Sequence, residues 1–170
     1  IDIKLVSDHE QLREKWDENP SEYISNVNTN KDGSKIVITA RGKVFVVPVE
    51  TGRTISFSDK SNVRYRDATF SSDGKEIITL SDESGEFEFI TMSADGMGDS
   101  KSITKDGSIL RYEGNPSPDG KFMAYSDLNE HLFILNITSG KSAKISTNQE
   151  GIRDYSWSPD SKWLSFVQVA

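Results

Sequence analysis

One short phrase occurs four times in this 170-residue chain, and its spacing restricts the fold more than any other feature. Each copy centres on an aspartate, followed by glycine in three copies and by serine in the last. The copies are Lys31-Asp32-Gly33, Ser72-Asp73-Gly74, Pro118-Asp119-Gly120 and Pro159-Asp160-Ser161, so successive aspartates lie 41, 46 and 41 residues apart. A four-stranded propeller blade takes roughly 40 to 45 residues. The spacing therefore predicts an all-β protein of the β-propeller class.

The residues after each phrase alternate as in a β-strand with one packed face. Four positions after the aspartate, every copy has an apolar residue: Ile36, Ile77, Met123 and Leu164. An Asp-Gly pair directly before such a segment is typical of a tight turn, because glycine tolerates positive φ angles. The pattern predicts strands over residues 36–40, 77–81 and 122–126. Trp157 and Trp163, which flank the last turn, are expected to pack in a blade core.

The remaining strands of each blade follow from the same alignment. A further apolar strand is predicted over residues 44–49, 87–92 and 132–137, and a shorter polar strand near 53–58, 100–104 and 141–146. The segment before each phrase is expected to be the innermost strand, over residues 23–29, 65–71, 111–117 and 152–158. We expect about three and a half four-stranded antiparallel blades, at approximately 23–60, 61–106, 107–148 and, incomplete, 149–170.

The first 22 residues differ from the repeats. Residues 1–5 alternate like a strand, and Ser7 with Glu10 fits a capping box at the start of a helix. We expect a short strand and then a short helix over about residues 8–17, ahead of a partial propeller at residues 23–170.

Charge and composition exclude several function classes. The chain has 27 acidic residues against 20 basic ones, which gives a net charge of −7. Nucleic acids and anionic membranes attract an excess of lysine and arginine, so we expect neither as a partner. The chain has no cysteine, which excludes disulfides and thiolate catalysis. No apolar run approaches the roughly 20 residues that a membrane-spanning helix needs.

The sequence offers no recognisable catalytic machinery. A serine hydrolase needs a nucleophile, a base and an orienting acid, and no Gly-x-Ser-x-Gly motif is present. His9 and His131 are the only histidines, and we expect each to be solvated rather than paired with a serine. Two histidines so far apart also make a poor zinc site. We therefore expect no catalytic residue in this chain.

Two partial motifs resemble ligand sites but lack a required residue. Residues 140–142 read like the end of a phosphate-binding loop, but Leu135 occupies the place of its first glycine. Residues 28–33 begin like a calcium loop, but Thr39 stands where a bidentate glutamate is needed. We interpret both as ordinary turns, and we expect neither a cofactor nor a metal ion.

Acidic residues recur at one position of the repeat. Six positions before the turn aspartate the four repeats carry, in order, Asn26, Asp67, Glu113 and Asp154. All four fall on predicted innermost strands, so they should gather near one mouth of the central channel. One hypothesis is an acidic ring that favours basic or amino-terminal ends of peptides. The other, which we favour, is a structural brace in which each carboxylate bonds to backbone N–H groups or to Arg66, Arg111 and Arg153.

Several segments resemble one known family. Residues 117–121 read Ser-Pro-Asp-Gly-Lys, the mark of the propeller repeats in TolB and tricorn proteins. Further segments are similar to the second propeller of tricorn proteases and their bacterial homologues. They are residues 13–16 (REKW), 39–45 (TARGKVF), 63–68 (VRYRDA), 80–89 (LSDESGEFEF) and 157–164 (WSPDSKWL), and the resemblance spans essentially the whole chain.

The resemblance implies more than the repeats do. Tricorn-type proteins are large serine peptidases that cut oligopeptides and assemble as hexamers, with a six-bladed and then a seven-bladed propeller. Their catalytic serine and histidine lie in later domains, so no catalytic residue carries over to this chain. The resemblance therefore implies a non-catalytic segment that serves as scaffold and as a peptide-access channel. Its partners would be the remaining blades and the protease domains of the parent protein.

Two other functions stay open. The chain could be a TolB-like propeller that binds protein partners, or a propeller enzyme with a central metal ion held by converging carboxylates. The leading strand and helix favour a second propeller that follows a first. We expect a cytoplasmic location, with the periplasm as the alternative.

Overall fold

The computed structural model describes residues 16–57, 60, 62–145 and 151–168. The leading strand and most of the leading helix expected for residues 1–22 fall on residues 1–15, outside the described part. Trp16 and Asp17, the last residues of that predicted helix, are not helical. A 3-10 helix, η2 (Pro20–Tyr23), follows them and leads into the first strand.

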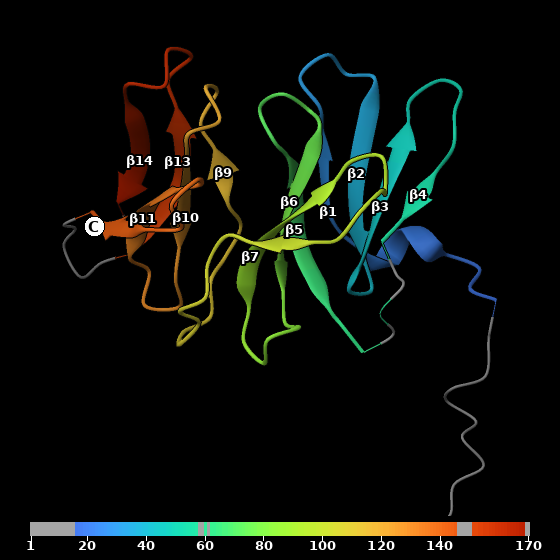
Figure 1. The fold of residues 1–170 in the computed structure, drawn as a ribbon, viewed down its shortest axis with the longest axis horizontal. Helices are drawn as coiled ribbons and strands as arrows, with labels where there is room; N and C mark the ends of the chain where they lie inside the picture. The colour runs from blue at the N-terminus through green and yellow to red at the C-terminus, as the bar shows by residue number, and fades with distance from the viewer. Residues whose placement is uncertain (1–15, 58–59, 61, 146–150, 169–170) are drawn as a thin grey trace, which may run out of the picture.

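The described strands form antiparallel sheets whose order follows the chain. The first blade contains β1 (Ile24–Thr29), β2 (Lys35–Ala40), β3 (Lys43–Pro48) and β4 (Ile55–Ser56), and the second contains β5 (Tyr65–Phe70), β6 (Glu76–Ser81), β7 (Glu88–Ser93) and β8 (Lys101–Ser102). The third contains β9 (Asn115–Pro116), β10 (Phe122–Ser126), β11 (Leu132–Asn136) and β12 (Ser142–Lys144), and β13 (Ile152–Trp157) pairs with β14 (Leu164–Gln168) in the fourth. Figure 1 shows the blades side by side, from β4 at the right to β14 at the left.

These sheets confirm the predicted all-β propeller architecture. The three segments predicted as strands after the Asp-Gly turns are β2, β6 and β10. In the last three turns the same serine and aspartate hold the chain. Ser71 Oγ donates to Asp73 Oδ1 at 2.8 Å and accepts from the backbone N–H of Glu76 at 3.0 Å. The turns at Ser117 and Ser158 repeat both bonds.

The innermost strand of the third blade is shorter than predicted. Of residues 111–117, only β9 belongs to the sheet, and Arg111 forms an isolated bridge with Asp127. Gly114 and Pro116 explain the difference, because glycine weakens a strand and proline cannot donate to its ladder.

Apolar side chains pack between neighbouring blades. Val37 and Val44 of the first blade pack with Phe70, Ile77 and Met92 of the second. The next junction is filled from both sides by Ile78, Leu80, Phe89, Met123, Tyr125 and Leu135, and the third by Ala124, Leu132 and Ile152. The core is therefore a series of interfaces between blades rather than one central cluster.

Tight glycine turns bring the outer parts of the second and third blades against the blade that precedes each of them. Gly96, in the loop that makes the second repeat five residues longer, has φ +75°, and a Cβ there would lie 2.7 Å from Ile55 Cγ2. Gly140 has φ +68°, and a Cβ there would collide with the carbonyl oxygen of Ile103. Both positions therefore need glycine for its conformation and for its size.

The two outward flanks of the described blades expose apolar side chains. Trp163 is 74% exposed, which contradicts the expectation that it packs in a blade core. Trp157 does pack, against the third blade. Trp163 is exposed because it lies on a face of the fourth blade that no described residue covers. Other exposed apolar side chains on the two end blades are Ile24, Val27, Val49, Phe166 and Val167.

Candidate functional site

Two of the recurring acids, Asp67 and Asp154, lie on innermost strands in unusual backbone geometry, whereas Glu113 lies just before β9. Asp67 in β5 and Asp154 in β13 have φ angles of 53° and 52°. Each lies where the strand register shifts, between Arg66 and Thr69 and between Arg153 and Ser156. They are the first residues of β-bulges in the left-handed region, which aspartate and asparagine tolerate better than other non-glycine residues. This backbone requirement is a reason for the repeated acid that the sequence pattern alone did not reveal.

The three carboxylates differ in their surroundings. Asp67 is the most enclosed, with 18% of its side chain exposed, and its Oδ2 lies 3.7 Å from Arg66 Nη2. Burial raises the pKa of Asp67 above its usual value, although the charge of Arg66 opposes that effect. Glu113 and Asp154 are exposed, and the described residues give neither carboxylate a hydrogen-bond or ion-pair partner. The contact with Arg66 agrees with a brace at Asp67, and the choice between brace and acidic ring stays a prediction.

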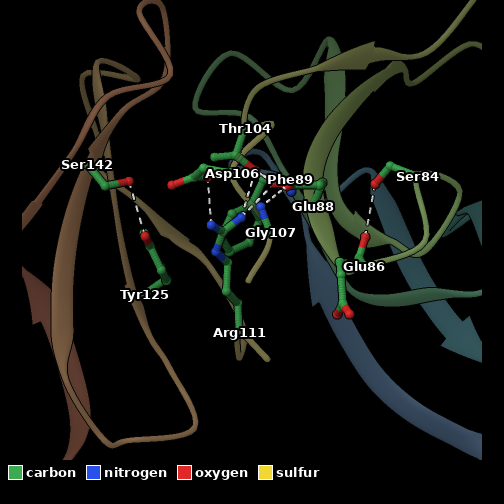
Figure 2. Close-up of polar contacts among 10 residues, drawn as sticks. All are labelled: Ser84, Glu86, Glu88, Phe89, Thr104, Asp106, Gly107, Arg111, Tyr125 and Ser142. Carbon is green, nitrogen blue, oxygen red and sulfur yellow. Dashed lines mark hydrogen bonds and ion pairs between the residues drawn. The ribbon is translucent and has the colours of Figure 1, made fainter. Parts of the chain in front are cut away.

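Arg111 does not pair with Glu113, so that part of the brace expectation is wrong. Its guanidinium points instead toward the second blade and the linker before the third, as Figure 2 shows. Arg111 Nη1 lies 2.6 Å from Glu88 Oε2, and Nη2 lies 2.7 Å from Asp106 Oδ1. No sequence pattern predicted this contact, because Glu88 precedes Arg111 by 23 residues and belongs to another blade.

Glu88 is the centre of this buried network. Besides Arg111, its carboxylate accepts hydrogen bonds from Thr104 Oγ1 and from the backbone N–H of Gly107. Only 7% of the Glu88 side chain and 4% of the Arg111 side chain are exposed, whereas Asp106 is 70% exposed. Burial opposes the charge of Arg111, but the bonds to Asp106 and Glu88 outweigh it and raise the pKa of Arg111. The network therefore joins two blades through paired buried charges.

Asparagine side chains bridge the innermost strands of two other blade pairs. Asn28 Nδ2 donates to the carbonyl of Ala68 at 2.9 Å, between the first and second blades. Asn115 Nδ2 donates to the carbonyl of Tyr155 at 3.0 Å, between the third and fourth. Thr69 occupies the corresponding position in the second blade. Each bridge ties the inner strands of two neighbouring blades together.

The ends of three successive inner strands line one cavity. Its volume is about 300 Å³, and it lies at the mouth formed by the Asp-Gly turns. The lining residues come from the first, second and third blades and include Thr29, Lys31, Thr69, Ser72, Asn115 and Pro118. Hydroxyl and amide side chains share this lining with Phe70 and Pro116, so it offers a polar chain both hydrogen-bonding groups and apolar contacts.

His131 is held by an acid, unlike the solvated histidine that we expected. Its Nδ1 lies 3.3 Å from Oδ2 of the buried Asp127, and 31% of the His131 side chain is exposed. An aspartate can orient a histidine base in this way, but no serine of the described residues bonds to the ring. His9, the other histidine, lies outside the described residues.

Other predicted features have simple outcomes in the described part of the chain. Residues 140–142 lie at a turn and in the outer strand β12. Within the described residues, no group of three or more histidine, cysteine, aspartate or glutamate side chains could hold a metal ion. No helix among them is long and apolar enough to cross a membrane.

Comparison with known proteins gives a consistent result. The family profile described as "Tricorn protease second beta propeller domain" matches residues 24–169. A "Tricorn protease homolog" from Saccharolobus solfataricus is 27% identical over 168 residues, which are 98% of this chain and 15% of that protein. A "Tricorn protease" from Thermoplasma volcanium is 24% identical and matches 86% of this chain and 14% of that protein.

Solved structures with the same fold include two propeller proteins. The crystal structure of the tricorn protease superposes with a TM-score of 0.73 at 15% identity, over 86% of this chain and 14% of that one. TolB from Acinetobacter baumannii superposes with a TM-score of 0.63 at 21% identity, over 84% of this chain and 37% of that one. The chain spans about one seventh of the length of the two curated relatives named above.

Proposed function

Because this chain belongs to the family of the tricorn protease second β-propeller domain, we propose that it is the non-catalytic wall of a peptide-access channel in a tricorn-like serine protease. The segment also serves as a scaffold for the domains that surround it. The catalytic serine and histidine lie in domains outside this chain. The substrates are oligopeptides, and the blade boundaries near residues 60, 106 and 148 remain a prediction.

The cavity shared by three inner strands is the observation that carries this proposal. Residues of β1, β5 and β9 or of the turns next to them contribute to its lining. Asn28 and Asn115 tie inner strands together beside it. An extended peptide needs hydrogen-bonding partners along its backbone, and a wall of amide, hydroxyl and main-chain groups supplies them without demanding a particular side chain.

The acids at the opposite end of the inner strands bear on the direction of entry. We propose that the exposed carboxylates of Glu113 and Asp154, together with Asp67, favour amino-terminal or basic ends of peptides. Charges of the same sign around one opening add their fields and raise the local concentration of cationic groups. The brace remains the alternative for Asp67, which has Arg66 beside it.

The partners follow from the family. We propose that the remaining blades of the propeller and the protease domains of the parent protein contact this segment, and that the parent assembles as a homo-hexamer. We expect a cytoplasmic location, with the periplasm as the alternative. Nucleic acids and membranes are not among the expected partners, because the net charge is −7.

The test uses the full-length gene product and one pair of fluorogenic peptides that differ only in a free or an acetylated amino terminus. The variant D67N/E113Q/D154N should lower kcat/KM for the free-amine peptide by about tenfold and leave the acetylated peptide unchanged. The control E50Q/E86Q/D99N removes the same charge from exposed positions away from the inner strands. An unchanged ratio between the two peptides, combined with a lower melting temperature, would leave only the brace.

A second candidate is a TolB-like module that binds protein partners. The observation in its favour is the superposition on TolB with a TM-score of 0.63. The two candidates differ in what the gene encodes beyond residue 170. A serine peptidase domain that co-purifies with peptide hydrolysis supports the channel, whereas its absence supports the interaction module.

A further inference from the structure

We propose that the buried Glu88–Arg111 pair is the lock of the junction between the second and third blades, and that its release opens this junction selectively. We call the interface between the second and third blades junction 2/3. Junction 1/2 joins the first and second blades, and junction 3/4 joins the third and fourth. The inference concerns the conformational freedom of the propeller wall and holds whether or not peptides pass through it.

Arg111 stands at a position that is apolar in the neighbouring blades. The strand registers align it with Tyr65 and Ile152, which open the inner strands of the second and fourth blades. All three residues are buried: the exposed fraction is 3% for Arg111, 5% for Tyr65 and 4% for Ile152. An arginine in such a place is costly unless an acid neutralises it and its N–H groups find acceptors. Glu88, Asp106 and Thr104 meet that need.

Glu88 also stands at a position that binds the linker in another blade. The registers Ala40–Lys43 and Ser81–Glu88 place Lys43 and Glu88 at the same point of the third strand. Lys43 Nζ donates to the carbonyls of Lys60 and Val63 in the linker to the second blade, at 3.1 and 3.4 Å.

In the second blade, Glu88 accepts hydrogen bonds where Lys43 donates them. Its partners are the Thr104 hydroxyl and the Gly107 N–H, in the linker to the third blade. The same position therefore ties the linker in both blades, with opposite charges. Glu88 differs from Lys43 in that its carboxylate is buried and therefore needs a cation beside it. Arg111 supplies it, and so links the tie to the inner strand of the third blade.

Junction 2/3 lacks the inner bridge of its neighbours. At junctions 1/2 and 3/4, Asn28 and Asn115 donate to the carbonyls of Ala68 and Tyr155. At junction 2/3, Thr69 replaces the asparagine and makes no side-chain bond to the described residues of the third blade. The carbonyl of Gly114 occupies the place of the acceptor, and only two residues of that inner strand are in the sheet.

The apolar contacts at junction 2/3 lie farther from the channel. Phe89 and Tyr125 meet edge to face with their ring centroids 5.2 Å apart, within the cluster that fills this junction. That packing holds the middle strands together and includes Ile103, but it includes no residue of 104–116. Loss of the Glu88–Arg111 pair should therefore free residues 104–116 while the middle strands stay packed.

Hydrogen–deuterium exchange of the full-length gene product tests this directly. In E88Q, amides within residues 104–116 should exchange about a hundredfold faster, because the buried Arg111 then keeps only the exposed Asp106 as its acidic partner. Exchange in β1 and β5 should stay within about twofold of the wild type. The matched control is E86Q, because Glu86 is exposed and its carboxylate points away from Glu88 in Figure 2.

Two further variants make the proposal specific. T69N introduces the missing donor opposite the Gly114 carbonyl, and it should slow exchange in residues 104–116 about tenfold, both alone and combined with E88Q. E88M/R111M removes both charges together and should exchange more slowly than E88Q, because an apolar pair leaves no buried charge. Unchanged exchange in E88Q, equal acceleration in all four blades, or no protection by T69N would each overturn the proposal. If E88Q does not fold, T69N in the wild-type background still tests whether the missing inner bridge makes residues 104–116 easier to open.

Discussion

Asn115 of the third blade donates its side-chain amide to the main-chain carbonyl of Tyr155 in the fourth blade at 3.0 Å. The hydroxyl of Tyr155 returns a bond of 2.7 Å to the carbonyl of Glu113, next but one to Asn115. Burial raises the pKa of Tyr155 to about 12, so this hydroxyl remains a donor at neutral pH. The two blades are therefore joined by reciprocal bonds between a side chain of one and the backbone of the other.

Removal of this bridge should weaken the junction measurably. N115A leaves the carbonyl of Tyr155 without its partner, and we expect a loss of about 1 kcal/mol in the free energy of unfolding. Urea denaturation followed by tryptophan fluorescence measures it, because Trp157 packs at the same junction. The control N62A changes an exposed asparagine and should leave the free energy unchanged. Equal stability of N115A and the wild type would show that the bridge adds nothing.

The bulge at Asp67 gives a second prediction. D67A should lose about 1 to 2 kcal/mol, since alanine is strained at a φ of 53°. D67N should be as stable as the wild type, because asparagine accepts this conformation and carries no charge that burial penalises. Thermal unfolding of the two variants side by side distinguishes the backbone role from the charge. Equal losses in both variants would mean that the carboxylate itself is needed.

The turn aspartates predict how stability depends on pH. Hydrogen bonds from serine hydroxyls and backbone N–H groups lower the pKa of Asp73, Asp119 and Asp160 below the usual value of 3.8. A lowered pKa in the folded state stabilises the fold above the usual value, and that stability is lost as the pH falls through the lowered pKa. Asp67 has the opposite sign, because its pKa is raised: its contribution improves as the pH falls toward 3.8.

D73N/D119N/D160N should therefore flatten the decline of the melting temperature below about pH 4. Asparagine keeps an acceptor in each turn, so the variant should still fold at neutral pH. Melting curves of both proteins between pH 2 and 7 provide the comparison. Parallel curves across that range would show that these turns do not govern acid sensitivity.

Gly140 should tolerate no side chain. G140A adds the strain of a φ of +68° and a collision with the carbonyl of Ile103, and we expect a loss of about 3 kcal/mol. G33A is the matched control, because Gly33 has a φ of +72° but nothing within 4 Å of an added Cβ. Its loss should be limited to about 1 kcal/mol. Similar losses in the two variants would argue against the close approach.

The exposed apolar flanks predict association of the 170-residue chain. Trp163, Phe166 and Val167 are apolar side chains in or next to β14, with 74%, 38% and 52% of their surfaces exposed. Sedimentation velocity should show oligomers whose fraction rises with concentration. W163D should shift the distribution toward the monomer, whereas K162D, one residue earlier, should not. A wild-type chain that stays monomeric at high concentration would contradict this expectation.

The repeat predicted the strands well because each Asp-Gly turn is a local signal. The prediction was weaker where the outcome depends on contacts between blades. Arg111 aligns with an apolar position, but its sequence neighbours do not identify Glu88 as its partner. The exposure of Trp163 was missed for a similar reason, because burial depends on whether another blade covers it. Asn28 and Asn115 were detectable in principle, since both lie four positions before a turn aspartate.

The bonds between blades also have a consequence for how the chain is made. Asn28 reaches Ala68 across 40 positions, and Asn115 reaches Tyr155 across 40. Trp157 and Asn115 are separated by 42, as are Asp119 and Ser161. Each blade thus bonds mainly to the one synthesised immediately before it. A chain that leaves the ribosome can therefore gain its lateral contacts one blade at a time, without waiting for a distant segment.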